Sequence, residues 1–524
     1  MSLNFASLLT ESAKSNPERT AIIFDSFKLT YSQLNAVTNQ FANGLDRLGI
    51  KRGDHVAIMM PNIPQFLIAY YGIAKLGAVI VPINVLFKAG EIDYVLNDSE
   101  ALALVAWEGF MEEAAKGYRL APLCHHLIIA QAPGSTNPLP AVDGVIKFEE
   151  VYKTCSPFYE LAPTQGDDTA VIMYTSGTTG RPKGAELTNL NCYFSAIASE
   201  KLMPVSPNDV GLGALPFFHI YGQSSVMNSM LERIGAITLI PRFDPAKVFE
   251  VIERDRVTIM CGVPTMFFAL LHYPDRKKFD TSSLKYAVSG GSALPVELLH
   301  AFEAEFKIPL LEGYGLSEDC ASATFNMVQK PRKAGSVGLA DWGTEVKVFD
   351  EKDREVGANE RGEIVLRGPN VMKGYYNRPE ATAEVMRDEW FHTGDIGYKD
   401  EEGYIYIVDR IKDLIIRGGY NVYPREVEDV FYQHPAIREA AVIGVPDPKF
   451  GEEIKAYVSL KPGYEATPAE LIEYLQERVA NYKYPRMLDI LPDLPKNATG
   501  KILKTNLRGL NNTSKPVGET IKSS

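Results

Sequence analysis

The sequence predicts an α/β protein of parallel sheets covered by helices, followed by a small β-barrel-like part and an α+β domain. Three observations support this fold class. The chain has 524 residues, which at about 150 residues per domain suggests three or four folding units. Short apolar runs alternate with helical patterns. The pattern of the sequence also changes near Gly335 and again near Lys412.

The composition is that of a folded protein. Hydrophobic residues make up 45% and charged residues 23% of the chain, which excludes disorder as the main state. The five cysteines include no C-x-x-C pair, so we expect reduced thiols in a cytoplasmic protein, with neither a disulfide framework nor a zinc site.

The net charge of −12 disfavours nucleic acid as a partner, because an acidic surface repels phosphate backbones. The charge is unevenly divided. Residues 413–524 carry 15 basic and 15 acidic side chains, whereas residues 1–412 carry 39 basic and 51 acidic ones. We therefore expect local groups to bind anionic ligands, because the average electrostatic field of residues 1–412 does not attract them.

The first part of the chain alternates helix and strand. Residues 30–50 have helical apolar spacing and begin with T-Y-S-Q, a capping box. A strand at 55–59, a helix at 64–77 and a strand at 79–83 follow. No continuous apolar span of about 20 residues is present, so we expect no transmembrane segment. The first residues resemble a short amphipathic helix more than a signal peptide.

Later segments complete the prediction. Further strands of the parallel part are predicted at 127–130, 170–174 and 284–288. Strands at 344–349 and 362–366, separated by charged and glycine-containing turns, suggest the small β-barrel-like part. In the last domain we predict helices at 426–432 and 468–479 and strands at 440–445 and 455–460.

The segment 174–184, Y-T-S-G-T-T-G-R-P-K-G, directly follows a predicted buried strand. Its glycines let backbone N–H groups turn towards an anion, and its hydroxyls and lysine add donors and charge, so it predicts a phosphate-binding loop. Pro182 precedes the lysine, which excludes a Walker A loop. The candidate residues are Thr175, Ser176, Gly177, Thr178, Thr179, Gly180 and Lys183. A plain surface turn is the alternative.

This loop and four later segments (S-G-G-S-A-L-P at 289–295, L-L-E-G-Y-G-L-S-E at 310–318, W-F-H-T-G-D at 390–395 and P-K-N-A-T-G-K at 495–501) stand in the order of the adenylate-forming superfamily. From about residue 10 to 510 the chain resembles its acyl-CoA synthetases. The resemblance implies that a carboxylate attacks the α-phosphate of ATP to give acyl-AMP, and that a thiol then displaces AMP.

The same resemblance implies a domain plan. A large N-terminal adenylation domain of two doubly wound sheets spans 1–409, with the β-barrel-like part at about 335–409. A hinge lies at 410–412, with Lys412 as its pivot, and a mobile C-terminal domain spans 413–524.

Nucleotide-binding residues are also implied by the resemblance. For adenine and AMP they are Gly291, Ser292, Ala293, Glu312, Gly313, Tyr314, Gly315, Ser317, Asp395 and Arg410. Ser317 replaces the threonine common in the family. Glu318 would hold Mg²⁺ on the phosphates, although an isolated glutamate is usually a solvated surface acid. Asp395 and Arg410 would bind the ribose. The alternative for Arg410 is a surface ion pair with Asp409 or Asp413.

Catalytic and thiol-site residues follow in the same way. Lys501 matches the adenylation lysine, whose ammonium offsets charge between a carboxylate and a phosphate. Lys496 is a competitor on the same loop. Gly418, Gly419 and Tyr420 match the segment that binds CoA after the C-terminal domain rotates.

The segment 215–222, L-P-F-F-H-I-Y-G, concerns the acid. No acidic residue lies between Leu212 and Leu231 to pair with an amino-acid ammonium, so an apolar tail is favoured. By resemblance His219 lies at the mouth of the acyl pocket, although a satisfied core histidine is the alternative. Expected wall residues are Tyr221, Gly222, Val226, Val263 and Thr265.

The expected reaction is thus ligation of a medium- or long-chain fatty acid to CoA with ATP and Mg²⁺. The nearest competitor is an aryl acid such as a cinnamate or benzoate. The sequence is also compatible with transfer of the acyl group to a carrier protein, with a luciferase-like oxidase, and with a nucleotide-binding module without catalysis. A lipid-like substrate would favour peripheral membrane contact, and the sequence makes no prediction of oligomeric state.

Overall fold

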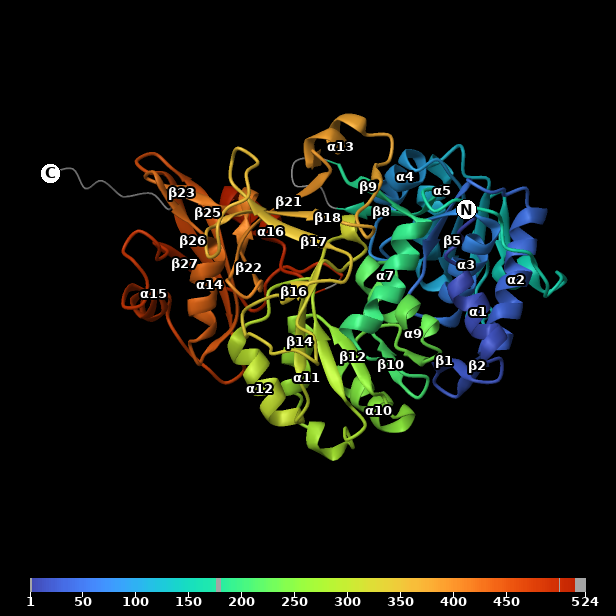
Figure 1. Ribbon diagram of the computed structural model, residues 1–524, viewed down its shortest axis with the longest axis horizontal. Helices are drawn as coiled ribbons and strands as arrows, with labels where there is room; N and C mark the ends of the chain where they lie inside the picture. Colours follow the sequence, from blue (N-terminus) through green and yellow to red (C-terminus); the bar gives the residue numbers. More distant parts are fainter. Residues whose placement is uncertain (1, 176–180, 499, 514–524) are drawn as a thin grey trace.

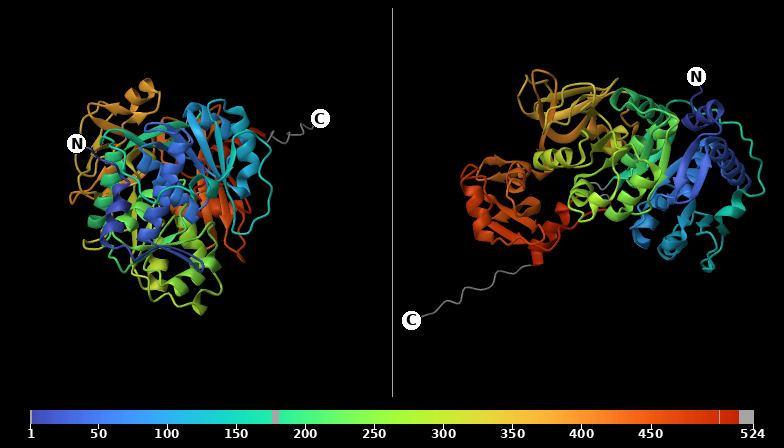
Figure 2. Two further views of the ribbon diagram at one scale, coloured as in Figure 1. Left: turned by 90° about the vertical axis from the view of Figure 1, so that its right-hand side faces the viewer. Right: turned by 90° about the horizontal axis from the view of Figure 1, so that it is seen from below.

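The computed structural model describes residues 2–175, 181–498 and 500–513. The protein has a large N-terminal domain of sheets and helices and a separate C-terminal domain, drawn in orange and red at one end of the molecule (Figures 1 and 2). The predicted α/β class is confirmed.

The first sheet has eight strands in the order β19-β9-β8-β4-β3-β5-β6-β7. They are β3 (His55–Met59), β4 (Val79–Pro82), β5 (Ala101–Trp107), β6 (His126–Ala130), β7 (Val145–Lys147), β8 (Thr169–Thr175), β9 (Lys183–Thr188) and β19 (Gly374–Tyr375). The strands from β8 to β7 are parallel, whereas β9 and β19 are antiparallel additions at one edge.

Helices cover both faces of this sheet. On one face lie α4 (Ala89–Asp98) and α5 (Met111–Leu120), and on the other α2 (Tyr31–Arg47), α3 (Pro64–Leu76) and α6 (Phe148–Tyr152). Alternate residues of the central strands enter the two cores: Val56 and Ile58 pack with α2 and α3, whereas Ala57 and Met59 pack on the other side. This alternation is what a strand buried on both faces requires.

The second sheet has nine strands in the order β16-β15-β14-β13-β12-β10-β11-β1-β2. They are β1 (Thr20–Phe24), β2 (Phe27–Thr30), β10 (Val210–Gly213), β11 (Ala236–Leu239), β12 (Ile259–Gly262), β13 (Tyr286–Ser289), β14 (Leu310–Tyr314), β15 (Thr324–Phe325) and β16 (Leu339–Ala340). Its outer face carries α10 (Pro245–Asp255), α11 (Pro264–Leu271) and α12 (Val296–Phe306). The inner core includes α1 (Ser7–Ser15), α7 (Asn189–Leu202) and α9 (Ser229–Glu232).

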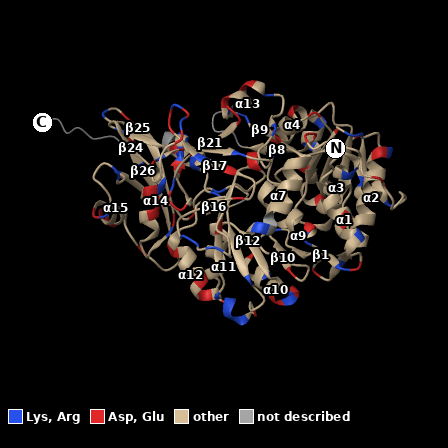
Figure 3. Cartoon of the chain, in the orientation of Figure 1, with Lys and Arg blue, Asp and Glu red and all other residues tan. Residues whose placement is uncertain are grey.

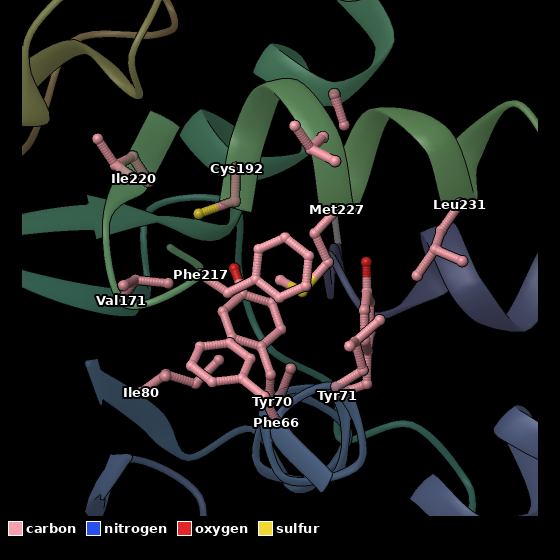
Figure 4. Close-up of a cluster of buried hydrophobic side chains, with 14 of the residues drawn as sticks. Phe66, Tyr70, Tyr71, Ile80, Val171, Cys192, Phe217, Ile220, Met227 and Leu231 are labelled. Carbon is pink, nitrogen blue, oxygen red and sulfur yellow. The ribbon is translucent and has the colours of Figure 1, made fainter. Parts of the chain in front are cut away.

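An aromatic core joins the two sheets (Figure 4). Phe66, Tyr70 and Tyr71 of α3 point up towards Phe217 and Met227, and all five side chains are fully buried. The rings of Tyr70 and Tyr71 meet edge to face at 5.4 Å. Such stiff packing fixes the separation of the two sheets, and with it the positions of the loops that follow their strands.

A third sheet has five strands: β17 (Glu345–Phe349), β18 (Gly362–Arg367), β20 (Met386–Arg387), β21 (Trp390–Lys399) and β22 (Ile405–Arg410). Helix α13 (Pro379–Val385) precedes β20.

The C-terminal sheet comprises β23 (Ile415–Arg417), β24 (Tyr420–Val422), β25 (Ile437–Asp447), β26 (Gly451–Leu460) and β27 (Met487–Ile490). Its helices are α14 (Pro424–Tyr432), α15 (Pro468–Gln476) and α16 (Lys504–Thr513). The exact domain boundaries and the hinge remain predictions.

Most predicted elements are confirmed within a few residues. The capping box is present at the start of α2, where Thr30 and Gln33 satisfy each other's backbone N–H groups. The span that follows is a buried helix, α3, and a buried strand, β4, as expected. Among the described residues, no helix is long and apolar enough to cross a membrane.

Asn62 links the two sheets just before α3. Its Nδ2 donates to the carbonyl oxygens of Gly213 at 2.8 Å and Leu215 at 2.7 Å, and its Oδ1 accepts from the N–H of Phe217 at 2.8 Å. The side chain is only 2% exposed, so these backbone groups have little access to water. Asn62 therefore fixes the segment that leads to His219.

We expect Asn62→Ala to lower the free energy of unfolding by about 3 kcal/mol or more, since each buried polar group left without a partner costs roughly 1–3 kcal/mol. Thermal unfolding measures the change. Asn43→Ala is the matched control, because the amide of Asn43 also makes three hydrogen bonds to backbone groups, all of them donated to carbonyls, but makes them near the surface. Equal shifts for the two variants would contradict the assignment.

Candidate active site

One cavity of about 1870 Å³ brings together most of the predicted site residues. It extends from the nine-stranded sheet to the C-terminal domain. Its lining includes Thr175, Lys183, His219, Tyr221, Gly222, Val263, Gly291, Ser292, Ala293, Glu312, Gly313, Tyr314, Gly315, Ser317, Glu318, Asp395, Arg410, Lys412 and Lys501. Residues 176–180, also predicted for phosphate binding, lie outside the described residues.

The two ends of the predicted phosphate loop meet at the edge of the first sheet. Thr175 ends β8 and lies opposite Lys183, which begins β9. The hydroxyl of Thr175 donates to the carbonyl of Lys183 at 3.4 Å. An antiparallel pair thus joins Thr175 and Lys183, and both residues line the cavity.

Glycines permit a close turn after β14. A Cβ on Gly315 would lie 2.3 Å from the backbone carbon of Ala321, and one on Gly313 would lie 2.8 Å from the Phe325 ring. Cys320 and Ala321 both have positive φ, at 58° and 76°. Residues other than glycine rarely adopt this backbone conformation, so the turn around Glu318 stores strain at the cavity wall.

Asp395 is a buried carboxylate, 2% exposed, with two strong partners. Tyr314 donates its hydroxyl to Oδ2 at 2.6 Å, and Arg410 pairs with Oδ1 through Nε at 2.8 Å. Asp395 and Arg410 are directly opposite each other in β21 and β22. The alternative of a surface ion pair between Arg410 and Asp409 or Asp413 is therefore wrong, because the strand register aims the guanidinium at Asp395.

Two glutamates lie at the wall with different surroundings. Glu312 is buried, and its Oε1 accepts from the N–H of Leu294 at 3.1 Å, while its Oε2 has no partner among the described residues. Burial raises the pKa of Glu312 to about 7, partly offset by Arg425. Glu318 accepts at Oε1 from the hydroxyl of Tyr375 at 3.0 Å, and burial raises its pKa too. Glu318 is thus not a solvated surface acid.

His219 caps the short helix α8 (Ile220–Gly222): its Nδ1 accepts from the N–H of Tyr221 at 3.3 Å. Burial and the charge of Lys501 lower the pKa of His219 to about 4. The ring is therefore neutral at physiological pH, with its proton on Nε2.

Two further residues are predicted to form the wall of the acyl pocket. Thr265 does line the cavity, whereas Val226 lies in the core between the two sheets, away from the cavity.

Gly222 lines the cavity, but its small size has a backbone cause. A Cβ there would lie 2.4 Å from the carbonyl oxygen of Pro216. Beside it, the hydroxyl of Tyr221 donates to the carbonyl of Val288 at 3.2 Å, and its ring lies against Gly290. Tyr221 therefore forms a fixed wall between the acyl segment and the loop at 289–295.

The C-terminal domain contributes Lys501 to this cavity. Asn497 holds the loop, accepting at Oδ1 from the N–H of Lys501 at 2.9 Å and donating its own N–H back to the Lys501 carbonyl. A Cβ on Gly500 would lie 2.6 Å from Oγ1 of Thr265, so the loop backbone packs closely on the N-terminal domain.

The surroundings of Lys501 also change its titration. Desolvation by the surrounding protein and, second, the positive charge of Arg410 lower the pKa of Lys501 to about 8. The competitor, Lys496, is paired with Asp493 and Glu439.

The predicted CoA residues lie elsewhere. Gly418 and Gly419 form the turn between β23 and β24 with φ of 57° and 85°, and both are exposed. Tyr420 stacks on Tyr482 at 4.8 Å. None of the three lines the cavity, whereas Lys412, in the 3-10 turn η5 (Ile411–Asp413), does.

Sequence reasoning missed Asn62 and Tyr375, and also Arg378, which lines the cavity and pairs with Asp98. None lies in a phosphate-type motif, and their partners are distant in sequence, so a single chain offers no local signal for them.

Among the described residues there is no group of three or more His, Cys, Asp or Glu side chains that could hold a metal ion. One carboxylate and nearby hydroxyls do fit Mg²⁺ that arrives on ATP phosphates.

Comparison with known proteins agrees with this geometry. Residues 9–376 match the AMP-binding enzyme family and residues 426–501 match the AMP-binding enzyme C-terminal domain. The chain therefore belongs to the AMP-binding enzyme family. Within it the protein is an AMP-forming acyl-CoA synthetase, an acid–thiol ligase.

Its relatives act on different acids. It is 38% identical over 526 residues to the long-chain-fatty-acid–CoA ligase of Bacillus subtilis, covering 96% of this chain and 93% of that one. It is 36% identical over 497 residues to a feruloyl-CoA synthase of Amycolatopsis sp, covering 95% and 96%. The crystal structure of ATP-bound MatB from Rhodopseudomonas palustris superimposes with a TM-score of 0.89 at 31% identity, covering 98% and 99%.

We expect Lys501 of the unliganded protein to react with an amine-selective acylating reagent with a midpoint near pH 8. Only the unprotonated amine reacts, so reactivity should rise with pH through that value, whereas an ordinary lysine titrates near 10.4. Mass spectrometry of the labelled peptide measures it. Arg410→Gln should raise the midpoint, because it removes a neighbouring positive charge. A midpoint near 10 in the unaltered protein would contradict the lowered pKa.

Proposed function

We propose that this acyl-CoA synthetase activates a medium- or long-chain fatty acid. The observation that carries the proposal is the apolar and acid-free acyl segment: Leu215, Phe218 and Ile220 line the cavity, and no carboxylate lies between residues 212 and 231 to pair with a charged amine. The relatedness to long-chain-fatty-acid–CoA ligases supports it.

In the first step, the carboxylate oxygen of the acid attacks the α-phosphorus of ATP while the bond to pyrophosphate breaks. The ammonium of Lys501 lies between the two anions and offsets the charge that develops. Neutral His219, within the acyl segment, donates a hydrogen bond from Nε2 to the acid without adding a charge. Glu312 accepts the adenine amino group at its unpartnered Oε2, and Asp395 and Arg410 bind the ribose.

Mg²⁺, when bound, would neutralise phosphate charge, and Glu318 is the residue proposed to hold it. Thr175, Lys183 and residues 176–180 bind the phosphates. In the second step, the C-terminal domain rotates about Lys412 and brings Gly418 and Gly419 to the cavity. The thiol of CoA then loses its proton to solvent, its sulfur attacks the acyl carbon, and AMP leaves with the bonding electron pair.

A second candidate substrate is an aryl acid that carries a hydroxyl group. Ser195, Ser224 and Ser225 are among the serines that line the cavity. Ser195 donates to the carbonyl of Cys320 at 3.2 Å and lies 2.5 Å from the hydroxyl of Ser224. Once these protons are committed, the pair offers lone pairs to a donor on the substrate. The feruloyl-CoA synthase relatives are consistent with such an acid.

ATP-dependent pyrophosphate release across a panel of fatty, cinnamic and benzoic acids tests the proposal. We expect the largest kcat/KM with fatty acids of about eight carbons or more, because each buried CH₂ contributes about 0.8 kcal/mol.

Lys501→Ala should abolish pyrophosphate release yet still convert preformed acyl-AMP to the thioester. Survival of both steps would contradict the role of Lys501, and a preference for hydroxycinnamates would favour the second candidate. Replacing CoA by a carrier domain tests the alternative acceptor.

We expect Gly419→Leu to block thioester formation from acyl-AMP while pyrophosphate release continues, because a bulky side chain would fill the path of the pantetheine arm. Gly463→Leu is the matched control: its φ of 79° is close to the 85° of Gly419, and an added Cβ meets no atom within 4 Å at either position. Equal loss of both half-reactions in Gly419→Leu, or the same loss in the control, would contradict the proposed tunnel.

A further inference from the structure

We propose that Tyr375 is a positioning residue that keeps the carboxylate of Glu318 and the ammonium of Lys183 apart and aimed at the ATP phosphates. The inference rests on the roles proposed above for these two residues. Tyr375 lies in β19, at the edge of the eight-stranded sheet, and its side chain lines the cavity.

The backbone around Tyr375 already connects the two halves of the phosphate site. The N–H of Met372 donates to the carbonyl of Glu318 at 2.7 Å. Four residues later the N–H of Tyr376 donates to the carbonyl of Gly184 at 2.8 Å, next to Lys183. One short segment is thus bonded at one end to the proposed metal ligand and at the other to the end of the phosphate loop.

The side chain of Tyr375 repeats this connection. Its hydroxyl donates to Oε1 of Glu318 at 3.0 Å. The Nζ of Lys183 lies over its ring, 5.2 Å from the centroid. A hydroxyl bonded to a carboxylate and a ring facing an ammonium are both favourable interactions, and here one rigid side chain makes both.

The ring is itself held in place. The N–H of Tyr375 donates to Oγ1 of Thr382 in α13 at 2.8 Å. The preceding Gly374 has a φ of 154°, and a Cβ there would lie 2.8 Å from the Thr382 side chain. The backbone that aims the ring is therefore fixed on both sides, as a positioning residue requires.

Separation of opposite charges is the consequence. Lys183 and Glu318 both line the cavity, yet among the described residues each contacts Tyr375 and no ion pair joins the two. A direct pair would satisfy each charge with the other and leave neither for a ligand. With Tyr375 between them, the ammonium remains available to a phosphate, and the carboxylate, which uses one acceptor position for the hydroxyl, keeps others for a metal ion.

Two substitutions separate the two contacts. Tyr375→Phe keeps the ring under Lys183 but removes the hydroxyl from Glu318, whereas Tyr375→Leu removes both. The binding of a non-cleavable analogue, α,β-methylene-ATP, is measured by titration calorimetry with Mg²⁺ and again with EDTA. We expect Tyr375→Phe to bind about tenfold more weakly with Mg²⁺ and unchanged in EDTA. Tyr375→Leu should bind more weakly in both conditions.

Tyr376→Phe is the matched control, because the neighbouring hydroxyl donates to Glu100 at 2.7 Å and that side chain does not line the cavity. Its binding should equal that of the unaltered protein. The inference is overturned if Tyr375→Phe binds normally with Mg²⁺, if it loses binding equally in EDTA, or if the control shows the same loss. Far-ultraviolet circular dichroism and the thermal midpoint identify a variant that has merely unfolded.

The calorimetry needs no acid and no turnover, so it separates two failures. If the unaltered protein binds the analogue equally with Mg²⁺ and with EDTA, the proposed role of Glu318 is wrong. If Mg²⁺ strengthens binding and Tyr375→Phe does not change it, only the positioning role of Tyr375 is wrong.

Discussion

The buried carboxylate of Asp395 is the point on which the geometry of the site depends. A buried charge is tolerated only when it is paired and hydrogen-bonded, because losing one partner costs several kcal/mol. Asp395 obtains one partner, Tyr314, from the second sheet and the other, Arg410, from the last strand before the C-terminal domain. The same side chain therefore joins the nine-stranded sheet, the small sheet and the start of the proposed hinge. Arg410 in turn lowers the pKa of Lys501.

Local patterns in the sequence predicted the elements well, because their causes are local. The apolar spacing and capping box of α2, and the continuous apolar run through α3 and β4, involve residues within a few positions of one another. The ordered motifs also led to the family, and most of the site residues that they predicted line the cavity.

Contacts between distant segments could not be predicted in the same way. The amide of Asn62 reaches backbone groups more than 150 positions away. The choice of Asp395 over Asp409 or Asp413 as the partner of Arg410 depends on strand register, and the position of Val226 depends on how η2 (Gln223–Asn228) turns. The acid itself is undetermined by sequence for the same reason: it depends on packing around the serines and Tyr221.

The distribution of charge agrees with local capture of anions. Both signs are scattered over the outer helices (Figure 3), so no broad basic face is visible in that view. The positively charged residues predicted for the site instead line one cavity: Lys183, Arg410, Lys412 and Lys501. The acidity of the body therefore discourages non-specific polyanions while the cavity still accepts a triphosphate.

The close packing of Gly500 on Thr265 has a kinetic meaning. The loop that carries Lys501 rests on Thr265 and Val263, which also line the cavity, so in the proposed mechanism the same loop closes over the acyl-adenylate. A mixed anhydride is readily hydrolysed, and a closed roof delays the entry of water. In the proposed mechanism the intermediate becomes accessible when the C-terminal domain rotates and the loop withdraws, and the same movement admits the thiol. In that mechanism, shelter of the intermediate and access of its acceptor exclude each other.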